Sequence, residues 1–217
     1  MINDASIKLL QNNNVLKGTT TIGVVCKDGI ILATDTRATM GYFIAHKKAK
    51  KVYKIDDHIA MTIAGAVADA QTVVEILKVN SKLYKYERGE PIPVNAAARL
   101  VANILFSSRY LPLMLQAIVG GVSNGKSQLF ALDPLGSLTE EKYVSTGSGS
   151  PIAYGVLETE FKENMSVKEA LPVVLKAIKS AIKRDAASGD DFDVALITLD
   201  GGYRELNKKE KEELFKN

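Results

Sequence analysis

The Gly18-Thr19 pair, at the start of a short run of threonines, could perform nucleophilic chemistry. If the peptide bond after Gly18 is cut, Thr19 becomes an amino-terminal residue. It then carries a hydroxyl that can attack a carbonyl carbon and a free α-amine that can accept the hydroxyl proton. Glycine suits self-cleavage here, because a residue without Cβ lets the Thr19 hydroxyl approach the preceding carbonyl. The same letters also fit a plain β-strand that begins after a turn.

Two predicted strands bring charged side chains back beside Thr19. The strands cover residues 22–26 and 30–33, and the Asp-Gly pair between them indicates a tight hairpin. The far end of this hairpin delivers Asp35 and Arg37.

A lysine-rich segment over residues 46–53, which we expect to be extended, supplies candidate cations. Read with a period of two, its lysines fall on two faces, Lys47 and Lys51 with Ala49 on one, and Lys48 and Lys50 on the other. A lysine held near the Thr19 hydroxyl and paired with Asp35 would favour the alkoxide and orient the proton transfer. The alternative is a solvated basic strand.

The apolar run over residues 59–65 predicts a buried strand that ends in glycine, and helical periodicity follows over residues 67–87. A strand that turns into a helix at Gly65 leaves unpaired backbone N–H groups at the positive end of the helix dipole. These groups could stabilise an oxyanion. Equally, Gly65 could only give a turn its conformational freedom.

Taken together, these features resemble the β subunits of the proteasome, which are N-terminal nucleophile hydrolases, and most closely the archaeal catalytic kind. The resemblance covers essentially the whole chain. It rests on short segments in a fixed order, namely GTTTIG at 18–23, ATDTR at 33–37, KK at 50–51, TIAG at 62–65, STGSGS at 145–150, AYGVLE at 153–158 and KRDAASG at 183–189.

The resemblance implies a role for each matching position. Thr19 matches the nucleophile, exposed by cleavage after Gly18, with Asp35 and Lys51 as its partners and the Gly65 N–H as the oxyanion donor. A polar cluster that would hold the terminal amine in one orientation matches Ser148, Asp185 and Ser188. Without the resemblance, residues 147–149 would be interpreted as a turn and Asp185 as a helix end.

The resemblance also implies a first specificity pocket, lined by Ala38, Ala49, Ile63, Val67 and Gln71. The two alanines leave room and the aliphatic side chains make an apolar wall, so we expect a chymotrypsin-like preference for large hydrophobic residues. Thr39 matches a position whose backbone pairs with an extended substrate.

The implied reaction is peptide-bond hydrolysis through an acyl-enzyme, by a threonine endopeptidase that needs no metal and no organic cofactor. His46 and His58 lack the arrangement of a metal site, and we predict both at the surface. We find no phosphate-binding glycine loop in the sequence.

Composition is compatible with one large domain. The 217 residues are 46% hydrophobic and 24% charged, and no linker or repeat divides them.

A net charge of only +3 with few aromatic residues argues against nucleic-acid binding, and no apolar run reaches membrane length. The single cysteine, Cys26, suits a reducing cytoplasm and is expected to be packed. We interpret residues 1–18 as a propeptide and residues 19–217 as the catalytic domain.

The remaining pattern alternates between helices and strands. We expect helices over residues 93–110, 151–160 and 167–185, a short final helix over 206–217, and strands over 115–122, 128–133, 141–146 and 194–199. The family's α+β fold, a four-layer αββα sandwich of two antiparallel sheets flanked by helices, accounts for this order.

Assembly is implied by the resemblance alone. In the family, seven β subunits form a ring, two β rings stack, and rings of α subunits cap them. The expected partners are therefore α subunits, other β subunits, a regulatory ATPase that acts through the α ring, and unfolded polypeptide substrates. No nucleic-acid or membrane partner is expected, and the implied location is cytoplasmic.

Two alternatives stay open from the sequence. The chain could be a weakly active or structural β subunit of the same ring, which stays unprocessed or depends on a second β subunit. It could also be another N-terminal nucleophile hydrolase, such as an amidase or the simpler bacterial two-ring protease. The segments at 147–150 and 185–188 favour the proteasome.

Overall fold

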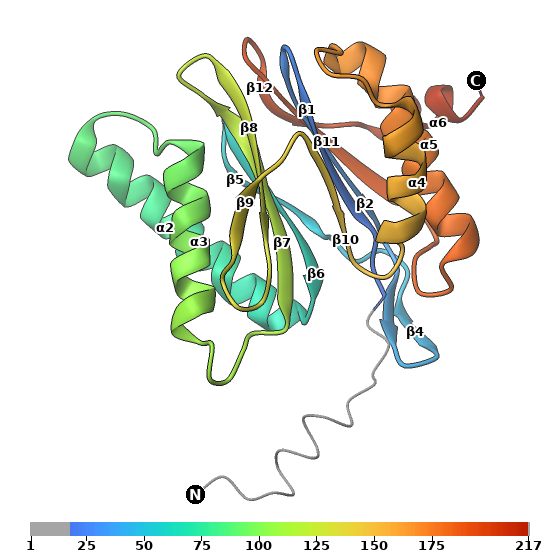
Figure 1. The fold of residues 1–217 in the computed structure, drawn as a ribbon, viewed down its shortest axis with the longest axis horizontal. Coiled ribbons are helices and arrows are strands. Elements are labelled where there is room, and N and C mark those ends of the chain that lie inside the picture. The colour runs from blue at the N-terminus through green and yellow to red at the C-terminus, as the bar shows by residue number, and fades with distance from the viewer. Residues whose placement is uncertain (1–17, 217) are drawn as a thin grey trace, which may run out of the picture.

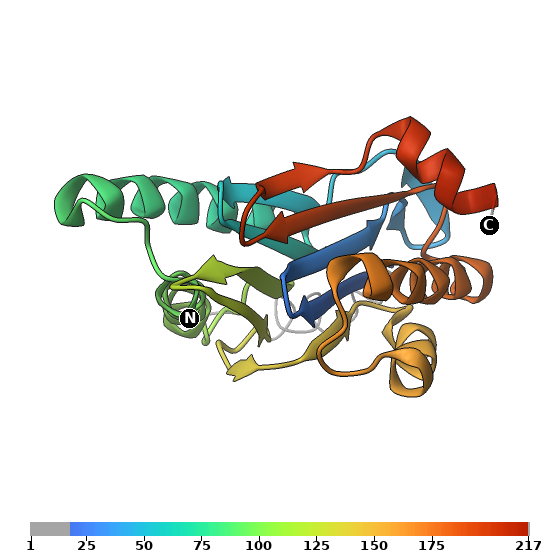
Figure 2. The ribbon, with the colours of Figure 1, turned by 90° about the horizontal axis from the view of Figure 1, so that it is seen from above.

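Two antiparallel sheets lie face to face between two pairs of helices in the computed structural model, which describes residues 18–216 (Figure 1). The first sheet has the strand order β10-β1-β2-β11-β12, and the second has the order β5-β6-β7-β8-β9. Figure 2 shows the same layers from above. This arrangement confirms the predicted α+β sandwich.

The first sheet consists of β1 (Thr21–Cys26), β2 (Gly29–Asp35), β10 (Tyr143–Thr146), β11 (Phe192–Thr198) and β12 (Gly202–Glu205). The second consists of β5 (Val52–Asp56), β6 (Ile59–Gly65), β7 (Leu115–Ser123), β8 (Lys126–Leu132) and β9 (Leu138–Glu140). A separate two-stranded hairpin is formed by β3 (Ala38–Met40) and β4 (Phe43–His46). In Figure 1 this hairpin projects from the sandwich.

The helices cover the two outer faces. The second sheet is covered by α2 (Val67–Arg88) and α3 (Val94–Ser107), and the first by α4 (Ser150–Glu160) and α5 (Val167–Arg184). The last helix, α6 (Lys208–Lys216), is tied to β11 by Lys211, whose Nζ donates to Asp193 Oδ1 at 2.8 Å.

Three apolar layers hold the sandwich together because the central strands are buried on both faces. In β2, Ile30 and Leu32 face the second sheet, whereas Ile31 and Ala33 face α4 and α5. All four side chains are fully buried. Such two-sided burial explains why β2 reads as a continuous apolar run instead of an alternating one.

The end of β2 and the loop that follows α5 lie side by side. The helix α5 begins with a capping box, in which Ser166 Oγ accepts from the Glu169 N–H and Glu169 accepts from the Ser166 N–H, and it ends at Arg184. The following residues, 185–191, lead into β11 beside the end of β2, where Phe192 pairs with Asp35.

Most predicted elements are confirmed, and the exceptions are local. Residues 46–53 do not form one extended segment, because β4 ends at His46 and β5 begins at Val52, with an irregular connection between them. Of the two histidines predicted at the surface, His46 is exposed, whereas His58 is partly buried. Its side chain is only 17% exposed and its Nε2 lies 2.8 Å from the Ile92 carbonyl oxygen.

Within residues 18–216, no helix is both long enough and apolar enough to cross a membrane. The predicted propeptide falls almost entirely on residues 1–17, which lie outside the described residues, and only Gly18 can be placed.

Candidate active site

Thr19 and Thr20 lead directly into β1, which lies between β10 and β2. The Thr20 carbonyl oxygen accepts from the Asp35 N–H at 3.1 Å, and the Thr19 carbonyl oxygen accepts from the Gly149 N–H at 3.3 Å. Both threonines are buried. The segment is therefore held on both sides before the regular ladder begins at Thr21.

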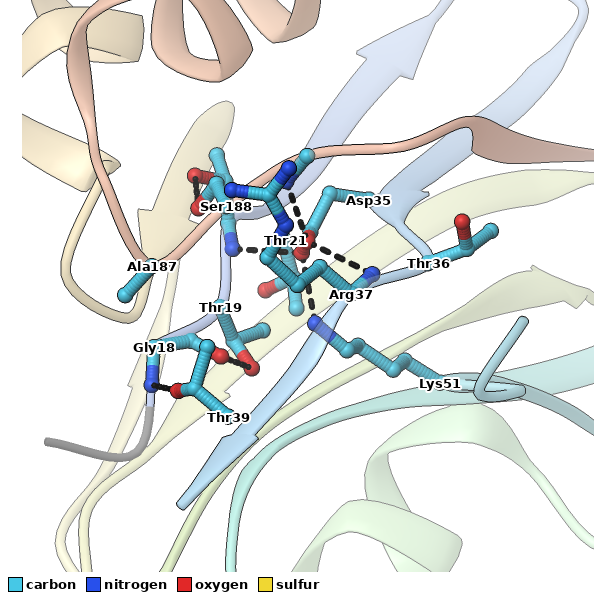
Figure 3. A network of polar contacts seen from close by, with 12 residues as sticks. Gly18, Thr19, Thr21, Asp35, Thr36, Arg37, Thr39, Lys51, Ala187 and Ser188 are labelled. Carbon is cyan, nitrogen blue, oxygen red and sulfur yellow. Dashed lines mark hydrogen bonds and ion pairs between the residues drawn. The ribbon is translucent and has the colours of Figure 1, made fainter. Parts of the chain in front are cut away.

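The Thr19 hydroxyl lies against the peptide bond whose cleavage would free its amine (Figure 3). Its Oγ1 donates to the Gly18 carbonyl oxygen at 2.6 Å. The Gly18 N–H donates to Thr39 Oγ1 at 3.0 Å, and the Thr19 N–H donates to Ser148 Oγ at 3.2 Å. A Cβ atom on Gly18 would lie 1.7 Å from Ala187 Cβ, so only glycine fits this position.

The Asp35 carboxylate at the end of β2 is fully buried and accepts four hydrogen bonds. Oδ1 accepts from Lys51 Nζ at 2.7 Å and from the Thr20 N–H at 2.9 Å. Oδ2 accepts from the Arg37 and Gly189 N–H groups, each at 3.0 Å. Because these donors come from four separate segments, the carboxylate has a single fixed orientation.

The Lys51 side chain points inward to Asp35 and is 7% exposed. The side chain of Lys50 is 53% exposed and pairs with Glu205 at the surface. Burial lowers the pKa of Lys51, and the charge of Asp35 together with the hydrogen bond to it opposes that shift. The Lys51 carbonyl oxygen accepts from the Ile63 N–H at 3.0 Å, which holds the lysine at the start of β5.

A second polar cluster lies beside the Thr19 nitrogen. Asp185 Oδ2 accepts from Ser148 Oγ at 2.5 Å and from Ser188 Oγ at 2.6 Å. The hydroxyls of Ser188 and Thr20 are 2.7 Å apart. The structure therefore brings Ser148, Asp185 and Ser188 together, although they come from the loop before α4 and the loop after α5.

The loop before α4 approaches Thr19 so closely that it needs glycine. Gly147 has φ +90°, and a Cβ atom there would lie 2.1 Å from the Thr19 carbonyl oxygen. This close approach lets the next residue, Ser148, reach the Thr19 nitrogen.

The Gly65 N–H points from β6 toward the side on which Lys51 lies. On β6 the Ile63 N–H donates toward Lys51, whereas the Ala66 N–H donates away, to the Met114 carbonyl oxygen at 2.7 Å. Because N–H groups two residues apart on a strand point in the same direction, that of Gly65 points toward the Lys51 side. Gly65 and Thr19 also line one cavity.

That cavity has a volume of about 310 Å³ and opens beside Thr19. Five of the six predicted substrate-binding residues line it, namely Ala38, Thr39, Ala49, Ile63 and Val67. The sixth, Gln71, lies outside the lining, at an exposed position one helical turn after Val67 on α2.

Several contacts of the site were not predicted from the sequence. Arg37 Nε donates to Asp190 Oδ2 at 2.8 Å and its Nη1 donates to the Ala186 carbonyl oxygen at 2.9 Å, which ties the loop after α5 to the end of β2. The hairpin pattern placed Arg37 beside Asp35 but gave no partner for it. Nothing in the sequence indicated that Ala187 packs against Gly18.

Among residues 18–216, no three histidine, cysteine, aspartate or glutamate side chains are grouped so that they could hold a metal ion. The polar groups at Thr19 are instead hydroxyls, one lysine, two carboxylates and backbone N–H groups, a set suited to proton transfer and to stabilising an oxyanion.

Residues 15–197 match the family model for proteasome subunits. The chain is 48% identical to the proteasome subunit beta of Methanothermobacter thermautotrophicus, over 96% of this chain and 99% of that protein. It is 52% identical to that of Methanosarcina barkeri, over 93% and 95%, and 55% identical to that of Methanocaldococcus vulcanius, over 87% and 85%. The chain therefore belongs to the proteasome subunit family, as a β-type subunit of a protease that is assembled from several subunits.

Proposed function

We propose that this chain is a threonine endopeptidase subunit of a proteasome core particle, which becomes active when it cuts its own chain after Gly18. Residues 1–18 are then a propeptide, and residues 19–217 form the catalytic domain. The observation that carries this proposal is the contact of 2.6 Å between Thr19 Oγ1 and the Gly18 carbonyl oxygen, beside a buried lysine and carboxylate pair.

Self-cleavage begins when Thr19 Oγ attacks the Gly18 carbonyl carbon. The new Oγ–C bond forms, the C–N bond to Thr19 breaks, and the hydroxyl proton ends on the Thr19 nitrogen. Water then hydrolyses the ester, which leaves a carboxylate on Gly18 and a free amine on Thr19. Ser148, which already accepts from the Thr19 N–H, and Asp185 behind it are placed to hold that amine.

Substrate hydrolysis repeats the same chemistry in another order. Thr19 Oγ attacks the scissile carbonyl, the amine or Lys51 takes part in moving the proton, and the Gly65 N–H stabilises the oxyanion. The first product leaves, and water releases the second from the ester. The Lys51 ammonium beside Asp35 favours the alkoxide, because a positive charge nearby lowers the cost of forming it.

The lining of the cavity supports a chymotrypsin-like preference. Ala38 and Ala49 are small, whereas Ile63 and Val67 present aliphatic surface. A large hydrophobic side chain of the substrate would gain about 25 cal/mol for each Å² of apolar surface that it buries there. Thr39 lies on the short strand β3, whose backbone can pair with an extended substrate.

The assembly that we propose follows the family. Seven such subunits form a ring, two β rings stack, and α subunits cap them, so that unfolded polypeptides reach Thr19 inside a closed chamber in the cytoplasm. A regulatory ATPase would act through the α ring. The alternative within the same assembly is a weakly active or structural subunit that keeps its propeptide or depends on a second β subunit.

The intact mass of the chain after assembly with α subunits tests this function. We expect a wild-type mass that begins at Thr19, and peptide hydrolysis that follows its appearance. Thr19→Ala is expected to assemble, to keep residues 1–18 and to show no hydrolysis. A Thr19→Ala complex that hydrolyses peptides normally would contradict the proposal, and a wild-type complex that keeps its full-length mass would favour the structural alternative.

A further inference from the structure

We propose that the Thr39 side chain is a positioning residue for self-cleavage, because its hydroxyl holds the Gly18 N–H while the Thr19 hydroxyl faces the Gly18 carbonyl. This inference rests on the self-cleavage proposed above. It differs from the substrate-binding role of the Thr39 backbone, since it assigns the side-chain oxygen to the precursor.

The peptide bond to be cut is held at both ends. On one side the Gly18 N–H donates to Thr39 Oγ1 at 3.0 Å, and on the other the Thr19 N–H donates to Ser148 Oγ at 3.2 Å. Ala187 closes a third side, since a Cβ atom on Gly18 would lie 1.7 Å from Ala187 Cβ. In Figure 3 the Thr39 side chain points at Gly18 from the side opposite to the loop after α5.

Gly18 needs such an anchor more than another residue would. Glycine adopts more backbone conformations than any other residue, and most of them would turn its carbonyl away from the Thr19 hydroxyl. Correct placement of reacting groups supplies a large part of many rate enhancements, and small displacements cost much of it. A hydrogen bond to the Gly18 nitrogen restricts the peptide plane before the carbonyl.

The short hairpin of β3 and β4 carries Thr39 to this position. Its register shifts between Ala38 and Thr39, where His46 pairs with Ala38 and Ile44 with Thr39, so the extra residue, Ala45, lies on β4. Both Ala38 and Thr39 line the cavity that Gly18 and Thr19 also line. The hairpin therefore brings Thr39 to the peptide bond that is to be cut.

The contact acts before cleavage, because its donor belongs to the piece that leaves. When the Gly18–Thr19 bond breaks, the Gly18 N–H departs with residues 1–18. The bond between Gly18 and Thr39 therefore contributes to the formation of the active subunit, and its loss should be visible in the rate of processing.

The test follows intact mass over time after the full-length chain is mixed with α subunits. Thr39→Val keeps the size and branching of the side chain but removes the hydroxyl, and we expect about tenfold slower appearance of the mass that begins at Thr19. Thr39→Ser restores the hydroxyl and is expected to process at nearly the wild-type rate. Thr139→Val, at an exposed position on β9, is the matched control and should process normally.

Each outcome decides the inference. Processing of Thr39→Val at the wild-type rate would overturn the role of Thr39 while self-cleavage stands, and so would Thr39→Ser being as slow as Thr39→Val. A wild-type chain that keeps residues 1–18 in complete rings would overturn self-cleavage and this role together. If Thr39→Val does not assemble, Thr39→Ala replaces it in the same comparison with Thr39→Ser.

Discussion

Gly18 and Gly155 differ in the space that surrounds their missing side chains. A Cβ atom on Gly18 would overlap Ala187, whereas a Cβ atom on Gly155, in α4, would meet nothing within 4 Å. The first glycine is therefore required by its neighbours, and the second is not. Together they offer a matched pair of substitutions for separating the demands of the site from those of folding.

We expect Gly18→Ala to slow removal of residues 1–18 by at least tenfold, because the added methyl group must displace either the scissile peptide or the loop that carries Ala187. Gly155→Ala should process normally and stabilise α4 by roughly 0.5–1 kcal/mol, since alanine is the better helix residue. Intact mass and thermal unfolding measure the two effects. If Gly18→Ala and the wild type lost residues 1–18 at the same rate, the overlap with Ala187 would not hinder cleavage and the prediction would be wrong.

Among the elements, the connection between β4 and β5 decides which lysine enters the site. Lys51 is the last residue before β5, and its carbonyl oxygen is fixed by β6. Its side chain therefore turns inward to Asp35, while that of Lys50 turns to Glu205 at the surface. One residue of displacement would exchange the two lysines.

We expect Lys51→Ala to reduce peptide hydrolysis by about 10²-fold or more, as is typical when a group that assists proton transfer is lost. Lys50→Ala removes an equal charge from the neighbouring position and should change hydrolysis by less than about twofold, because exposed ion pairs contribute little. Turnover per chain with a free Thr19 is the quantity to compare. A larger loss of hydrolysis in Lys50→Ala than in Lys51→Ala would contradict the assignment of Lys51 to the site.

The long elements could be predicted from the sequence, whereas most of the short ones could not. The apolar run over β6 and the helical period of α5 depend on many residues each, so local pattern identifies them. The strands β3, β4, β9 and β12 have three or four residues, and their pairing is set by the segments against which they lie. For the same reason residues 46–53 were wrongly expected to be one extended segment.

The residues of the candidate site show the same difference between local and distant contacts. The Gly18-Thr19 pair and the hairpin that returns Asp35 could be identified from local sequence, because both depend on neighbouring residues. The contact of Thr39 with Gly18 depends on where the hairpin of β3 and β4 lies, and that of Ala187 depends on where the loop after α5 lies. Neither has a sequence signal of its own.

At the scale of the whole molecule, three buried layers extend through both sheets and both helix pairs. Cys26, at the end of β1, lies in the layer between the first sheet and its helices and is 2% exposed. Burial, assisted by the nearby charge of Asp28, raises the pKa of the Cys26 thiol from 9.0 to about 12. Its ionisation is thereby coupled to unfolding.

The sign of this coupling gives a prediction for alkaline pH. Between pH 9.0 and about 12 the unfolded chain loses the Cys26 proton while the folded chain keeps it. This group should therefore lower the free energy of unfolding by up to about 1.4 kcal/mol per pH unit. Denaturant unfolding on both sides of the lower pKa should show a shallower alkaline loss of stability in Cys26→Ala. Identical slopes in the two proteins would contradict the prediction.

The attachment of Thr19 and Thr20 to both neighbouring segments has a consequence for the survival of the enzyme. A protease cuts chains that can be drawn out in extended form, and frayed ends are the usual points of attack. Here the carbonyl oxygens of both threonines are engaged, and β1 follows between two other strands. Thr19, the proposed nucleophile, could loosen only by breaking these hydrogen bonds next to a strand in the middle of the first sheet, where local opening is costly. In the proposed function, the end that attacks substrates is thereby kept from becoming a substrate of its neighbours.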